Sequence, residues 1–165
     1  MRPHALSTLV LAILLIVFGA PASAHAQAGT ITGRVSLTTP KGEVVYGDWV
    51  RVYLTSEPAE VPAVDLNSAM KPWERRDRLN SVHMDFFVNF RDKQNDAGYA
   101  VDDKLCRPDG TFTFSGLPAG RYYVVVTFPS MIAGFKCAWQ AEVDLVEGKS
   151  VHVELNAKNL ALPSY

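Results

Sequence analysis

The stretch Asp109–Val126, which reads DGTFTFSGLPAGRYYVVV, carries the clearest strand and turn signals in this chain. The Asp-Gly pair at its start is a tight-turn signal. Phe112 and Phe114 then alternate with small polar residues, as in a strand that buries one face. Pro118 and Gly120 indicate a second turn, and the β-branched and aromatic run after them has a high strand propensity. The stretch therefore predicts two short strands joined by a tight turn.

Segments before and after this stretch show the same alternation of apolar and polar residues. They are Thr30–Leu37, Trp49–Thr55, Cys137–Leu145 and Ser150–Leu155. About six short strands with turn signals between them are typical of a β-sandwich. We therefore expect a mostly β fold, built as an antiparallel β-sandwich.

One segment, residues 57–103, does not fit the strand pattern. It begins with a proline-containing linker and continues as a charged stretch, Pro72–Asn95, without glycine or further proline. Apolar side chains recur there at helical spacing, at Leu79, Val82, Phe86 and Phe90. Alternation over 82–90 also allows a strand, but no turn signal interrupts the stretch, which favours one long helix. Its apolar stripe predicts that Phe86 and Phe90 are buried against the sandwich.

The N-terminal segment has the three parts of a secretory signal peptide. Arg2 is basic, Leu9–Phe18 is an uninterrupted apolar run, and small residues at Ala-x-Ala spacing end at Ala28. The apolar run is too short for a spanning helix, which needs about 20 residues. We expect cleavage after Ala28 and a periplasmic or secreted product with no stable membrane span. An uncleaved anchor is the alternative.

The composition is that of an ordinary globular domain, with 48% apolar and 20% charged residues. With a net charge of −1, the chain lacks the excess of basic residues that nucleic-acid-binding proteins use to contact phosphates. No nucleic-acid partner is therefore expected. The 165 residues suit one domain with a real core. We expect that domain over residues 29–158, with a helical insert at about 68–97 and a C-terminal tail over 159–165.

The chain has two cysteines, Cys106 and Cys137. In an oxidising compartment a disulfide is the first expectation, and two free buried thiols are the alternative. Cys106 precedes the strand that ends at Phe114, and Cys137 opens the strand after Arg121–Phe128. If the strands on either side of the Leu117–Gly120 turn pair as a hairpin, both cysteines reach the same end of the sandwich. We therefore predict a Cys106–Cys137 bridge.

Four segments of the chain also resemble a known family. They are GTITGRVSL (29–37), WVRVYL (49–54), the stretch 109–126, and EVDLVEGKSVHVEL (142–155), in that order. Together they resemble the carboxypeptidase regulatory-like domain, a transthyretin-like sandwich that is also grouped with carbohydrate-binding-like folds. The resemblance implies a Greek-key sandwich of the prealbumin type, in which the helical insert has no counterpart. It implies little about function, because such sandwiches carry many unrelated roles.

Catalytic, cofactor-binding and metal-binding patterns are missing from the sequence. The transthyretin-like 5-hydroxyisourate hydrolases end in Tyr-Arg-Gly-Ser, whereas the last four residues here are Leu-Pro-Ser-Tyr. His83 and His152 have no paired histidine at ligand spacing. The stretch Asp92–Gly98 departs from the spacing of a calcium loop. We therefore expect a protein that is not an enzyme and that uses no cofactor or metal.

Aromatic residues form the candidate binding surface. With the apolar residues of 50–54 pointing inward, Trp49 and Tyr53 lie on the outer face of their strand beside Arg51, and Tyr123 lies on the outer face of a later strand. Exposed aromatic rings can stack on sugars through their apolar faces. The alternative is that the predicted helix lays its apolar stripe over the same aromatics.

These observations predict a module that acts by binding rather than by catalysis. The first hypothesis is that it binds an envelope or extracellular protein. A carbohydrate-binding module that uses the exposed aromatics is the alternative, with a polysaccharide as its ligand. A third hypothesis is an accessory subunit of a secreted assembly.

Overall fold

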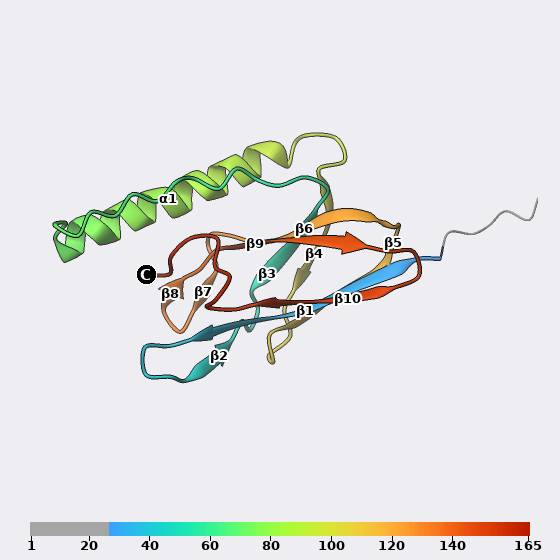
Figure 1. Cartoon of the computed structure of the whole chain (residues 1–165), viewed down its shortest axis with the longest axis horizontal. Coiled ribbons are helices and arrows are strands. Elements are labelled where there is room, and N and C mark those ends of the chain that lie inside the picture. The colour runs from blue at the N-terminus through green and yellow to red at the C-terminus, as the bar shows by residue number, and fades with distance from the viewer. Residues whose placement is uncertain (1–26) are drawn as a thin grey trace, which may run out of the picture.

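The computed structural model describes residues 27–165, which form two β-sheets packed face to face and one long helix outside them (Figure 1). The first sheet contains β10 (Ser150–Leu155), β1 (Gly29–Thr38) and β2 (Val44–Tyr46), with β5 (Thr111–Leu117) also paired to β1. The second sheet has the order β4 (Ala100–Leu105), β3 (Arg51–Thr55), β6 (Gly120–Val126) and β9 (Trp139–Leu145). A short hairpin joins β7 (Met131–Ile132) to β8 (Phe135–Lys136). Residues 1–26, and with them nearly all of the predicted signal peptide, lie outside the described residues.

The mostly β sandwich with one long helix is confirmed. Its main core lies between the two sheets and is built by the alternation seen in the sequence. Phe112 and Phe114 of β5 are buried there, as are Val124 and Val126 of β6. Trp139 of β9 is also fully buried, and its indole N–H donates to the carbonyl oxygen of Asn156 at 2.9 Å. Local alternation therefore decides which side chains enter the core.

Two turns carry the chain between the sheets, and one of them is the turn that we expected to close a hairpin. β5 pairs with β1, whereas β6 pairs with β3 and β9, so the Leu117–Gly120 turn crosses from the first sheet to the second. The turn between β9 and β10 crosses back in the same way. β10 then pairs with β1 in parallel, while every other strand pair in residues 27–165 is antiparallel. A turn signal marks where a strand ends, but it does not say which strand becomes the neighbour.

The helix α1 (Pro72–Lys93) begins at the predicted residue and ends two residues before the predicted end. Pro72 fits the first turn of α1, because a backbone N–H at that position has no carbonyl partner within a helix and its absence in proline costs no hydrogen bond. The backbone N–H of Lys71 donates to the Glu74 carboxylate at 2.8 Å, which completes the start. Phe86 and Phe90 are 0% and 1% exposed, so their predicted burial is confirmed. The strand alternative for 82–90 is wrong.

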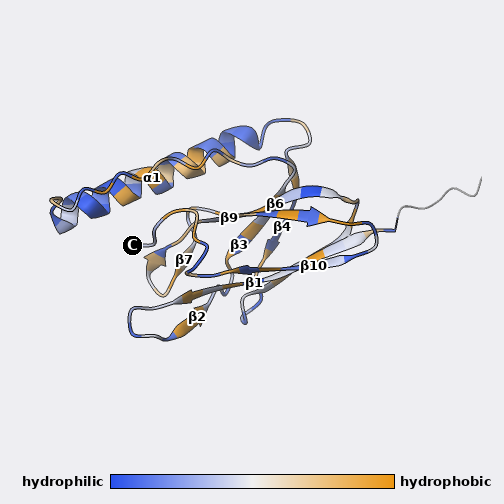
Figure 2. Cartoon of the chain, in the orientation of Figure 1, coloured by the Kyte–Doolittle hydropathy of each residue, from blue (hydrophilic) through white to orange (hydrophobic). Residues whose placement is uncertain are grey.

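The helix packs on the outer face of the second sheet and forms a second apolar cluster with it. The ring centre of Phe90 lies 4.7 Å from that of Tyr53, and Val125 of β6 is fully buried below the helix. Figure 2 shows apolar residues along the middle turns of α1. The linker before the helix runs back along it (Figure 1), and Lys93 donates to the carbonyl oxygen of Pro58 at 3.1 Å. The helix therefore covers part of the outer aromatic face.

β4 forms one edge of the second sheet, and it places charged residues where its neighbour places apolar ones. The register pairs Val52 with Lys104 and Leu54 with Asp102, so these side chains share the inward face. The ammonium of Lys104 donates to the Asp102 carboxylate at 2.7 Å and lies 5.9 Å from the ring centre of Phe114. This reversed pattern explains why the sequence does not predict β4 as a strand.

Candidate functional site

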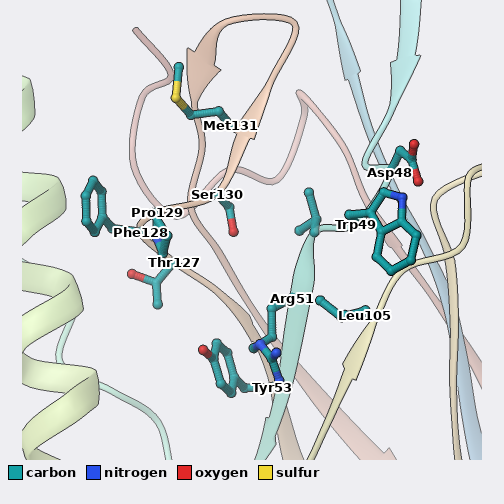
Figure 3. A pocket seen from close by; sticks show the side chains of 11 residues that line it. Asp48, Trp49, Arg51, Tyr53, Leu105, Thr127, Phe128, Pro129, Ser130 and Met131 are labelled. Atoms are coloured by element: carbon teal, nitrogen blue, oxygen red, sulfur yellow. The ribbon is translucent and has the colours of Figure 1, made fainter.

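A groove of about 410 Å³ lies at one end of the second sheet, between the starts of β3 and β7 (Figure 3). Residues from the turn before β3, from β3 itself, from the end of β4, and from the segment after β6 up to the first residue of β7 line it. They are Asp48, Trp49, Val50, Arg51, Tyr53, Leu105, Thr127, Phe128, Pro129, Ser130 and Met131. We call this surface the Trp49 groove.

Trp49 stands at one rim of the groove, opposite Thr127 and Phe128 (Figure 3). Its φ is 58°, in the left-handed region that bulky residues rarely adopt. The turn that holds it is closed by the Val50 N–H, which donates to the Gly47 carbonyl oxygen at 3.2 Å. Its side chain is 70% exposed, so the indole contributes little to the core. An exposed indole and a strained backbone conformation both fail to stabilise the folded state. Their occurrence at one residue is typical of functional sites.

Arg51 and Tyr53 form the floor of the groove on β3. The guanidinium of Arg51 pairs with the Asp103 carboxylate of the neighbouring strand, which partly neutralises its charge. Burial raises the pKa of Tyr53 above its ordinary value. Its hydroxyl is therefore protonated at neutral pH. The Phe90 ring packs against the Tyr53 ring, with their planes inclined at 52°, so the helix covers part of this ring.

The opposite wall combines hydroxyl groups with exposed apolar side chains. The Thr127 hydroxyl is buried and has no hydrogen-bond partner among residues 27–165. The Ser130 N–H donates to the Thr127 carbonyl oxygen at 3.1 Å, which fixes the turn. Met131 is 54% exposed on this wall, and Leu105 is 44% exposed on the β4 side. The groove therefore presents an aromatic ring, two flexible apolar side chains and a paired cation.

The structure brings together three of the four residues of the predicted binding surface. Trp49, Arg51 and Tyr53 line the groove, whereas Tyr123 is half-buried at the margin of the helix cluster. The contributions of Leu105 and Met131 were missed. They lie on β4 and β7, two strands that the alternation pattern does not indicate, and no sequence signal marks them as neighbours of Trp49.

Both cysteines lie beside the groove as buried thiols. The Cys106 N–H donates to the Val50 carbonyl oxygen at 2.8 Å, and the Cys137 N–H to that of Ser130 at 3.4 Å. Burial raises the pKa of each thiol to about 12, which makes both poor nucleophiles. The two side chains are not bonded in this structure. They approach the same end of the sandwich, although the hairpin that we expected to bring them there does not form.

The Cys106–Cys137 bridge therefore stays a prediction. We expect the exported chain to carry it, and we expect reduction to lower the free energy of unfolding by about 3 kcal/mol. Mass spectrometry after alkylation, with and without reductant, measures the bridge directly. The Cys106→Ala/Cys137→Ala double variant is the control, because reductant has nothing to act on there. Two alkylated thiols in the unreduced exported protein would contradict the prediction.

The two histidines of the described chain lie apart. His83 is buried in α1, where its Nε2 donates to the Pro163 carbonyl oxygen at 2.9 Å, and burial lowers its pKa. His152 is exposed on β10 beside Glu154. Within residues 27–165, no three His, Cys, Asp or Glu side chains come close enough to hold a metal ion. No helix in that range has the length and apolar character to cross a membrane.

No family model and no curated protein sequence matches the chain. Solved structures show similarity at the level of the fold. A Pseudomonas aeruginosa protein, described as a candidate carbohydrate-binding protein, has a TM-score of 0.44 and 17% identity over 82% of this chain and 92% of its own. The minor pilin of Streptococcus agalactiae has a TM-score of 0.45 and 12% identity over 79% of this chain and 44% of its own.

The major pilin subunit of Bacillus cereus is similar in the same way, with a TM-score of 0.41 and 12% identity. That match covers 79% of this chain and 29% of the pilin. The chain therefore spans less than half the length of these two pilins. At such identities the likeness concerns the fold alone.

Proposed function

We propose that this chain is a non-enzymatic binding module that holds a protein partner at the Trp49 groove. The observation that supports this most directly is Trp49, a large aromatic side chain held at the rim, 70% exposed, by a strained backbone. Tryptophan and arginine are the residues that contribute most to protein interfaces, and Arg51 lies in the same groove. Leu105 and Met131 supply apolar area that a partner side chain can bury.

A sugar is the second candidate ligand, favoured by the free Trp49 ring and by the Ser130 hydroxyl. The walls fit it less well, because Leu105 and Met131 offer neither a flat ring nor a hydrogen-bonding group. Tyr53 cannot offer a free ring face on the side where Phe90 packs. A protein side chain uses all of these apolar surfaces, so we place the protein partner first.

We also propose that the chain is exported and that its sandwich is a carboxypeptidase regulatory-like domain over residues 29–158. The segment up to Ala28 has the pattern of a signal peptide, and each of the four segments that carry the resemblance overlaps at least one strand of the sandwich. The partner is then an envelope or extracellular protein. A partner that remains bound through purification would make this chain an accessory subunit of a secreted assembly.

Photo-crosslinking in the organism of origin tests the proposed function. A photoreactive amino acid at Leu105 of the exported chain is expected to give one dominant protein adduct, identified by mass spectrometry. Trp49→Ala should lower its yield by about tenfold or more, as expected for the loss of a central interface tryptophan. Trp73→Ala is the matched control, because Trp73 is 56% exposed on α1 and does not line the groove.

Two outcomes would contradict the proposed function. One is an adduct whose yield is the same in Trp49→Ala and in the parent chain. The other is a shift on polysaccharide affinity gels that disappears in Trp49→Ala, which would establish the sugar as the ligand instead. A thermal melt of each variant shows whether the fold is retained.

A further inference from the structure

A second hollow of about 360 Å³ adjoins the Trp49 groove, and Met131 lines both. Three segments enclose it, namely the first half of α1, the β7–β8 hairpin and the C-terminal residues. Its main lining residues are Arg76, Asp77, Asn80, Met131, Lys136 and Tyr165. We call it the Lys136 hollow. Because Met131 lines both spaces, they are neighbours on the surface, and one extended ligand can contact both.

Lys136 is a half-buried cation that the fold holds in place without neutralising it. Its ammonium donates to the Asn80 side-chain oxygen at 2.6 Å and lies 5.1 Å and 5.4 Å from the ring centres of Phe128 and Tyr165. Tyr165 donates to the same Asn80 oxygen at 2.8 Å. No carboxylate in residues 27–165 forms an ion pair with Lys136. Aromatic faces stabilise the charge, but they leave it unpaired.

Arg76 adds a second unpaired cation to the same hollow. It lies one helical turn before Asn80, so both side chains project from the same face of α1. Within the described chain, Arg76 also has no ion pair. The acidic groups among the lining residues are the side chain of Asp77 and the carboxylate of the last residue, Tyr165, and neither forms an ion pair with Arg76 or Lys136. The side-chain oxygen of Asn80 accepts the hydrogen bonds from both Lys136 and Tyr165. The amide nitrogen of the same side chain has two further N–H groups that can donate to a ligand.

We propose that the Lys136 hollow binds a carboxylate on an extended acidic peptide segment of the partner, while an apolar side chain of that segment occupies the Trp49 groove. The guanidinium of Arg76 can hold a carboxylate through two parallel hydrogen bonds, with Lys136 as the second charge. The two unpaired side-chain cations and the shared position of Met131 beside both spaces favour this occupant. The inference rests on the proposed function, because the apolar anchor is the one that the Trp49 groove receives.

A titration with model peptides tests the proposal on the exported chain. The probes are the blocked peptide Leu-(Gly-Glu)4 and its neutral counterpart Leu-(Gly-Gln)4. The backbone amide NMR signals of Gly134 and Lys136 report on the hollow. We expect the glutamate peptide to shift both signals at low salt, where screening is weak, and the glutamine peptide to leave them unchanged.

Charge-removing variants then locate the site. Arg76→Gln/Lys136→Gln should weaken binding of the glutamate peptide by about tenfold or more. Arg75→Gln/Arg78→Gln is the matched control. It also removes two positive charges, from exposed α1 residues that do not line the hollow, and it should change the affinity by less than about twofold.

Three results would overturn the proposal. The first is equal affinity for the two peptides. The second is a loss of affinity in Arg75→Gln/Arg78→Gln as large as that in Arg76→Gln/Lys136→Gln. The third is tighter binding of tri-galacturonic acid than of the glutamate peptide. The crosslinking yield at Leu105 separates this inference from the proposed function. If the crosslinking yield falls in Trp49→Ala but is unchanged in Arg76→Gln/Lys136→Gln, the inference alone is overturned. The opposite pattern would overturn the proposed function, and with it the apolar anchor, while the carboxylate site at the Lys136 hollow would stand.

Discussion

Replacing Phe90 with alanine is expected to lower the free energy of unfolding by about 3–5 kcal/mol, the range for a buried phenylalanine. Phe90 is fully enclosed between the helix and the second sheet, with the rings of Tyr53 and Tyr99 at 4.7 Å and 6.2 Å between centres. Tyr53 lies on β3 and Tyr99 directly precedes β4, so the two rings cannot move together to fill the space that the Phe90 ring would leave. The loss therefore includes both the burial of the ring and the cavity that it leaves.

Urea denaturation measures this loss if the slope of the transition is unchanged. Trp73→Ala on the same helix is the control, because its exposed ring predicts a change within about 0.5 kcal/mol. A Phe90→Ala variant as stable as the parent chain would contradict the burial. The apolar stripe of α1 would then be a partner-binding face.

Replacing Gly33 with alanine is expected to lower the free energy of unfolding by about 3 kcal/mol, the upper part of the range for overpacking. A Cβ at this position would lie 2.2 Å from the Phe112 ring and 2.5 Å from the Val153 carbonyl oxygen. Gly33 lies in the middle of β1, with β5 on one side and β10 on the other. Because both neighbouring backbones are paired, neither can move away without breaking hydrogen bonds.

Gly42→Ala is the matched control for this second variant. Its φ is 82°, but nothing lies within 4 Å of its added Cβ, so only the backbone conformation opposes the substitution. That strain is worth about 1 kcal/mol. Thermal and urea unfolding of both variants separate the lack of space at Gly33 from the conformational requirement at Gly42. Equal losses would contradict this account.

The sequence predicts those features of the fold that depend on neighbouring residues. The alternation at Phe112 and Phe114 identifies a strand and its inner face, and helical spacing identifies Phe86 and Phe90 as the buried stripe of α1. Pairing is different, because it depends on residues far apart in the chain. The Leu117–Gly120 turn is compatible with a hairpin or with a crossing between sheets, and only the packing of the whole sandwich selects the crossing.

For the candidate site, too, the sequence predicts only what depends on neighbouring residues. Trp49 and Arg51 are close in sequence and lie before and at the start of β3, so their alternation places them near one another. Met131 and Lys136 reach the same region only because the β7–β8 hairpin lies beside α1 and the C-terminal residues. No local pattern encodes that approach.

The charged residues on the inner face of β4 have a consequence for the behaviour of the protein at high concentration. An edge strand with unpaired backbone groups is a template on which another sheet can grow. A strand added at β4 would place its own inner row beside Asp102 and Lys104 instead of beside apolar side chains, and it would bury charge without gaining a core. Val101 and Leu105 are exposed on the same strand, so aggregation would otherwise begin there. The inner face of β4 therefore disfavours the addition of a further strand at this open edge, next to the Trp49 groove.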